Sequence, residues 1–156
     1  MTVDELLARE AIRDTMARYT MAGDRLMIDD FLACFTEDAV IETDRVPEAR
    51  AFRYAGRAAI RAWQERWRAG AGATHGASFV RHQLSTSKID LTGADSAAAR
   101  TYWVAWTDIG PDHAGVYLDD CRKEGEAWLI ARRRIRLDWE SPQTVFSEAV
   151  SNSGPD

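Results

Sequence analysis

The feature that most constrains the fold is a series of four long β-patterned segments in the second half of the chain. We predict strands at residues 79–91, 97–109, 114–123 and 127–139. Short stretches with Gly, Pro, Asp and Glu separate these segments and are typical of turns, so consecutive strands are expected to pair antiparallel. The second half of the chain therefore predicts one antiparallel-rich sheet.

Three helical patterns precede these strands. Thr2 and Glu5 have the spacing of a capping box, so the first helix is expected to begin there. Gly23 is expected to end it, because glycine enters the left-handed region without steric cost. A second helix is predicted at residues 29–35. A third follows Gly56, with Ile60, Trp63 and Trp67 on one face and glycines 70 and 72 after it.

Two short strands are expected to flank the loop between the second and third helices, one beginning at Val40 and one ending near Tyr54. Helices first and long strands afterwards indicate the α+β class, with a curved sheet wrapped around three N-terminal helices. Such a sheet leaves a pocket at one end. The length of 156 residues fits one domain, which we place at residues 1–140, followed by a polar tail at residues 141–156.

Composition narrows the function classes. A formal charge of −5 argues against a nucleic-acid partner or an acidic membrane surface, because both require a basic surface. The acidic N-terminal segment is unlike a secretion signal, and no run of apolar residues is long enough to span a membrane, so a cytoplasmic protein is expected. Cys34 and Cys121 have no CxxC spacing, and nothing in the sequence requires a disulfide between them.

Asp24 and His82 are the candidate catalytic residues. Asp24 lies at the end of the first helix and His82 within a predicted strand, so only the fold can bring them together. A carboxylate that contacts a histidine fixes its tautomer and leaves the other ring nitrogen free as a base. The alternatives are that Asp24 only caps the following helix and that His82 is a half-buried structural histidine.

Six features, in this order and spacing, carry a family resemblance. They are Asp24 after the first helix, Asp38-Ala39-Val40, Tyr54-Ala55-Gly56-Arg57, Arg81-His82, Tyr117 in the strand after Gly115, and the segment from Trp128 to Arg133. On these residues the chain resembles, over residues 5–139, the SnoaL-like branch of the nuclear-transport-factor-2-like (NTF2-like) superfamily. The resemblance implies a cone-shaped α+β barrel.

Within that branch the pattern is most similar to scytalone dehydratase and hexachlorocyclohexane dehydrochlorinase. The resemblance implies an Asp–His pair at Asp24 and His82 that eliminates a small leaving group without a cofactor. Scytalone dehydratase also has a second active-site histidine and a tyrosine before its aspartate; here Gly23 precedes Asp24, and His113 is not assigned to the second histidine. The expected function is a lyase (dehydratase) or isomerase acting on a small hydrophobic cyclic or polyketide-like molecule, in a family that also contains polyketide cyclases.

Tyr19, Trp103 and Tyr117 are the candidate substrate-binding residues, although packing alone would also account for Tyr19. The three histidines fall in separate segments and no H-E-x-x-H motif occurs, so no metal site is expected. Arg133 lies among apolar neighbours on its strand and therefore needs a partner, either a buried acid or a bound anion.

Two other functions stay open. The domain could bind an apolar molecule without reaction, or it could be an assembly subunit, as the β-subunits of ring-hydroxylating oxygenases are in this superfamily. The open sheet and its aromatic residues suggest a homodimer or homotrimer. Closure of the pocket by Val145 and Phe146 of the tail is a further hypothesis.

Overall fold

The structure is a computed structural model that describes residues 1–46, 48–71 and 77–146. Its helices are α1 (Val3–Asp24), α2 (Ile28–Leu32) and α3 (Arg57–Arg66), with a short 3-10 turn η1 (Glu48–Arg50) and a π turn η2 (Trp67–Ala71). Its strands are β1 (Phe35–Asp44), β2 (Arg53–Ala55), β3 (Arg81–Leu91), β4 (Ser96–Thr107), β5 (Gly110–Glu124) and β6 (Ala127–Glu140).

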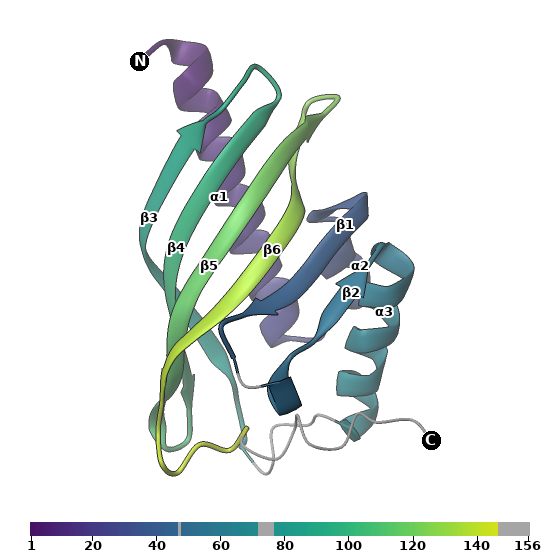
Figure 1. The fold of residues 1–156 in the computed structure, drawn as a ribbon, viewed down its shortest axis with the longest axis vertical. Coiled ribbons are helices and arrows are strands. Elements are labelled where there is room, and N and C mark those ends of the chain that lie inside the picture. The colour runs from purple at the N-terminus through teal and green to yellow at the C-terminus, as the bar shows by residue number, and fades with distance from the viewer. Residues whose placement is uncertain (47, 72–76, 147–156) are drawn as a thin grey trace.

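The six strands form one curved, unclosed sheet in the order β2-β1-β6-β5-β4-β3. Strand β4 pairs antiparallel with β3 and β5, and β5 pairs antiparallel with β6, as the sequence predicts; β2 pairs antiparallel with β1. Strand β1 instead pairs parallel with β6. Helix α1 runs along one face of the sheet and α3 lies at the β2 edge (Figure 1). The α+β prediction is confirmed. Within the described ranges no helix is long and apolar enough to cross a bilayer.

The first helix begins as predicted but ends differently. Thr2 is its N-cap, and both hydrogen bonds of the capping box with Glu5 are present. The prediction that Gly23 ends the helix in the left-handed region is wrong, because Gly23 and Asp24 are still helical and the positive φ of 53° belongs to Leu26. Gly23 serves close packing instead, since a Cβ there would lie 3.3 Å from the ring of Phe31.

The second helix is shorter than predicted. It covers Ile28–Leu32 rather than residues 29–35, because Phe35 already belongs to β1 and pairs with Ile130 of β6. The backbone N–H of Ile130 donates to the carbonyl of Cys34 at 2.9 Å, which fixes the chain at this point. Cys34 and Cys121 are both buried free thiols.

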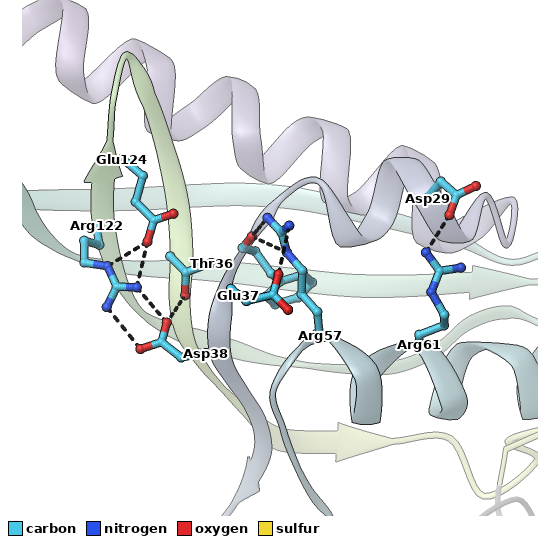
Figure 2. Close-up of polar contacts among 9 residues, drawn as sticks. Asp29, Thr36, Glu37, Asp38, Arg57, Arg61, Arg122 and Glu124 are labelled. Atoms are coloured by element: carbon cyan, nitrogen blue, oxygen red, sulfur yellow. Dashed lines mark hydrogen bonds and ion pairs between the residues drawn. The ribbon is translucent and has the colours of Figure 1, made fainter.

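Arginines tie α3 to the rest of the fold (Figure 2). Arg57, at the start of the helix, donates to the carbonyl of Phe35 through two of its nitrogens and approaches Glu37 at 3.4 Å. One turn later, Arg61 contacts Asp29 of α2 at 2.6 Å. These contacts place the apolar face of α3 against β1 and β2, where it forms one wall of the interior.

The concave face of the sheet carries the core. Along β4 the odd-numbered residues from 97 to 107 face inward, and among them Trp103 pairs in register with Gly115 of β5. A Cβ at Gly115 would lie 1.9 Å from the carbonyl oxygen of Arg136 and 2.8 Å from the Trp103 ring. Glycine is therefore required at this position, and its lack of a side chain lets the Trp103 indole lie flat beside Tyr117, with ring centroids 5.4 Å apart.

Candidate active site

A cavity of about 300 Å³ opens among the C-terminal turn of α1, the inner face of α3, the first halves of β3 and β5 and the second halves of β4 and β6. Its walls are mainly aromatic and aliphatic, with Phe31, Phe52, Trp63 and Trp67 among them. Every residue that the sequence singles out as a site candidate lies on its wall: Tyr19, Asp24, His82, Trp103 and Tyr117. The volume is at the small end of the range for ligand pockets and suits a molecule of one or two rings.

Asp24 and His82 meet at this cavity, although 58 residues separate them in the sequence. Oδ1 of Asp24 lies 2.6 Å from Nδ1 of the imidazole, and Oδ2 accepts the backbone N–H of His82 at 2.9 Å. The Asp24 side chain is 6% exposed and that of His82 is 26% exposed. Asp24 is not the cap of α2, because the N-cap there is Met27 and no side chain bonds to it.

The two bonds to Asp24 orient the imidazole. A carboxylate can only accept a hydrogen bond from Nδ1, so the neutral ring carries its proton on that nitrogen. Nε2 then has the lone pair, and it makes no hydrogen bond with the described residues. Because the backbone N–H bond holds the second carboxylate oxygen, Asp24 cannot rotate away without leaving the partly buried N–H of His82 unpaired.

A second histidine–aspartate pair, which was not predicted from the sequence, lies on the same wall. Nδ1 of His113 lies 2.8 Å from Oδ1 of the fully buried Asp112, and the His113 ring centroid is 6.1 Å from that of His82. Burial lowers the pKa of His113, which outweighs the opposing effect of Asp112, and a charge on His82 would lower it further. A neutral His113 is therefore favoured, and its proton too is held on Nδ1.

Asp112 also binds the segment after β6. Burial raises the pKa of its carboxyl, but hydrogen bonds from the Thr144 hydroxyl, the His113 ring and the backbone N–H of Val145 together hold it below its usual value. The Phe146 ring stands 4.9 Å from the His113 ring and lines the cavity. The described part of the tail thus reaches the cavity wall, whereas residues 147–156 lie outside the described residues.

Tyr19 and Tyr117 share a buried cation. The guanidinium of Arg133 lies between their rings, 4.0 Å and 4.1 Å from the two centroids. Asp119 binds the same guanidinium in a bidentate pair, with both N···O distances at 2.7 Å. Of the two partners considered for Arg133, the structure therefore shows the buried acid. Burial raises the pKa of both tyrosines, so their hydroxyls stay protonated at neutral pH.

Trp103 lies beside both histidines. Its ring centroid is 5.8 Å from that of His82 and 5.4 Å from that of His113. The indole N–H is buried and has no acceptor among the described residues. The further polar side chains that line the cavity include Arg50, Gln64 and Glu140, and no sequence signal was specific enough to select them. Arg50 and Glu140 form an ion pair at 2.8 Å.

Within the described ranges, no three His, Cys, Asp or Glu side chains are grouped so that they could hold a metal ion.

A family model described as the SnoaL-like domain matches residues 4–134. The chain belongs to the SnoaL-like family. This agrees with the predicted resemblance. No curated protein matches the sequence of this SnoaL-like protein.

Solved structures share its fold. A provisionally named scytalone dehydratase from Novosphingobium aromaticivorans is 25% identical, with a TM-score of 0.74 over 90% of this chain and 91% of its own. A hexachlorocyclohexane dehydrochlorinase (LinA type 2) is 13% identical, with a TM-score of 0.70 over 89% and 90%. The beta subunit of a provisionally named aromatic-ring-hydroxylating dioxygenase from N. aromaticivorans is 18% identical, with a TM-score of 0.72 over 88% and 93%. The fold thus occurs both in enzymes that eliminate small groups and in an oxygenase subunit.

Proposed function

We propose that this SnoaL-like protein is a cofactor-independent lyase or isomerase that removes a carbon-bound proton from a small hydrophobic cyclic or polyketide-like molecule. The observation that carries the proposal is the 2.6 Å contact between Asp24 and Nδ1 of His82 at the wall of an aromatic cavity. Similarity to a dehydratase and a dehydrochlorinase supports the same reaction class.

In the proposed reaction, Nε2 of His82 takes a proton from the carbon next to a carbonyl group. The C–H electron pair becomes a carbon–carbon double bond, and Asp24 stabilises the imidazolium that forms. In an elimination the leaving group departs with its bonding pair and receives the proton from His82. In an isomerisation the carbonyl π pair moves onto the oxygen to give an enolate, and the same proton returns to another carbon as the carbonyl re-forms. Positioned base catalysis of this kind contributes about 10²–10⁴ in rate.

His113 is suited to orient the substrate. Its pKa is lowered by burial and its Nδ1 proton is held by Asp112, so Nε2 of the neutral ring is an acceptor. We assign it the role of accepting a hydrogen bond from a substrate hydroxyl, while His82 carries the proton. The aromatic walls exclude water, which strengthens the interaction between Asp24 and the imidazolium.

The test measures proton removal directly and needs no knowledge of the leaving group. Exchange of the α-protons of 1-indanone, 2-tetralone and cyclohexanone in D₂O is followed by proton NMR with wild-type protein, His82→Ala and Gln83→Ala. Gln83 is the matched control, because it is the next residue on β3 and faces outward. We expect enzyme-dependent exchange with at least one ketone, its loss in His82→Ala and its retention in Gln83→Ala. Equal exchange in the wild type and His82→Ala would refute the assignment and favour a binding module.

We also propose self-association through the outer face of the sheet. Tyr102 and Trp106 of β4 and Trp139 of β6 are 38–48% exposed on this face, and exposed aromatic residues are typical of interfaces. Two or three copies of the chain are the expected assembly, and an oxygenase-type catalytic subunit is the alternative partner. Light scattering after gel filtration should give a mass two or three times 17.5 kDa, reduced to the monomer mass by Tyr102→Glu.

A further inference from the structure

Gln64 is a polar residue on the apolar face of α3. It follows Ile60 by one helical turn, and Ile60 is fully buried, so both side chains point toward the interior. Gln64 is 5% exposed and lines the same cavity as His82. Its Oε1 is buried without a hydrogen-bond partner among the residues that the structure describes.

An unpaired amide at this position is costly for the folded protein. A buried acceptor without a donor loses its hydration and gains nothing in return, whereas leucine or methionine would fill the same space at no such cost. Trp63 of α3 and Trp67 of η2 are aromatic cavity residues near Gln64 in the sequence, and they offer Oε1 no hydrogen bond. No described residue donates a hydrogen bond to Oε1, although Gln64 lies on a cavity wall. This arrangement points to a ligand that supplies the missing donor.

The position of α3 sets where that ligand group lies. Helix α3 packs against β1 and β2, whereas His82 is on β3, at the other end of the strand order. In Figure 1, α3 stands beside β2 at the right-hand edge, whereas β3 runs behind the other strands from the left-hand edge toward the lower centre, so the two elements form different walls. A substrate whose reacting carbon faces His82 therefore presents its far end to Gln64.

We propose that Gln64 is a substrate-recognition residue that binds a hydroxyl group on the end of the ligand remote from His82. This deepens the proposed function and rests on it. A hydroxyl fits because it donates to Oε1 and can also accept from the amide nitrogen. A carboxylate or ammonium group fits less well, because the aromatic walls would remove its hydration and the neutral amide supplies no opposite charge. The substrate class is thus a hydroxylated cyclic ketone.

The test compares binding of 1-indanone with binding of its 5-hydroxy, 6-hydroxy, 5-methoxy and 6-methoxy derivatives by isothermal titration calorimetry. In the wild type at least one hydroxyindanone should bind about 10- to 100-fold more tightly than 1-indanone and its methoxy counterpart. Gln64→Met keeps the side-chain length and should reduce that preference to less than about threefold. Gln83→Met, the same change on the outer face of β3, should leave it unaltered.

Two further measurements separate this inference from the proposed function. Gln64→Met should melt at the wild-type temperature or about 2–4 °C higher, because it removes an unpaired buried group, so loss of folding would not explain a lost preference. The hydroxyl preference should persist in His82→Ala, whose proton exchange is the test of the reaction. The same preference in the wild type and Gln64→Met, or no binding of any hydroxyindanone, overturns the role of Gln64. Such a result does not bear on the role of His82, which the proton-exchange measurement tests separately.

Discussion

Replacing Asp24 by asparagine should invert the tautomer of His82 while keeping the fold. The backbone N–H of His82 donates to Asp24 Oδ2 at 2.9 Å. In Asp24→Asn the side-chain carbonyl oxygen has to accept this bond, because the NH₂ group would place a second donor against the N–H. The asparagine NH₂ group then faces Nδ1 of the ring, at the position where the carboxylate now lies 2.6 Å away. Nδ1 becomes an acceptor, the ring proton moves to Nε2, and the nitrogen that faces the substrate is no longer a base.

The expected loss follows from this geometry. With the base in the wrong tautomer, the rate of α-proton exchange should fall by about 10²–10⁴, which corresponds to roughly 3–5 kcal/mol of transition-state stabilisation. The free energy of unfolding should fall by only about 1–2 kcal/mol, because a charge-assisted bond is replaced by a neutral one and no buried donor is left unpaired.

Two measurements check the reasoning. Proton NMR of 1-indanone in D₂O gives the exchange rate, and ¹⁵N shifts of the imidazole report which nitrogen carries the proton. We expect Nδ1–H in the wild type and Nε2–H in Asp24→Asn. The argument fails if Asp24→Asn exchanges protons within a factor of three of the wild type, or if both proteins give the same tautomer.

Two other predictions concern stability. Asp119→Ala leaves the fully buried Arg133 without its carboxylate and should lower the free energy of unfolding by about 3–5 kcal/mol. Urea unfolding followed by circular dichroism measures this, and a loss below 1 kcal/mol would contradict a buried ion pair. Burial lowers the pKa of His113 from 6.5, so the unfolded chain binds this proton more readily than the folded chain and stability should fall as the pH drops below about 6.5. His113→Gln should flatten the dependence between pH 7.5 and 5.5, whereas an unchanged slope would exclude His113 as its source.

Much of the fold could be predicted because its strongest signals are local. Strand β4 alternates inward and outward residues along its length, and the capping box at Thr2 involves neighbouring residues only. The parallel pairing of β1 with β6 depends on a contact between residues about 90 positions apart, which no periodicity reveals. The error at Gly23 has a different origin, since Gly23 packs against the ring of Phe31 in the next helix, and a glycine near a helix end does not reveal such a contact.

The candidate site was less accessible to sequence reasoning. Asp24 and His82 were selected together because of a family resemblance, whereas their contact depends on the fold. Asp112 was interpreted as part of a turn because it follows Gly110 and Pro111, although it is fully buried beside His113. The only sequence signal for Gln64 is that a polar residue follows Ile60 by one turn on an apolar helix face. This pattern does not tell whether the side chain lines a cavity or packs in the core.

The parallel pairing of β1 with β6 also has a consequence for how the protein is made. Strand β1 is synthesised before β3, β4 and β5, and its partner β6 is the last of the six strands to be synthesised. Until then β1, β2 and α3 lack the sheet edge on which they pack, whereas the hairpins of β3 to β5 can already form from neighbouring residues. We therefore expect the wall that carries Gln64 to settle, and the cavity to be complete, only after β6 has been synthesised.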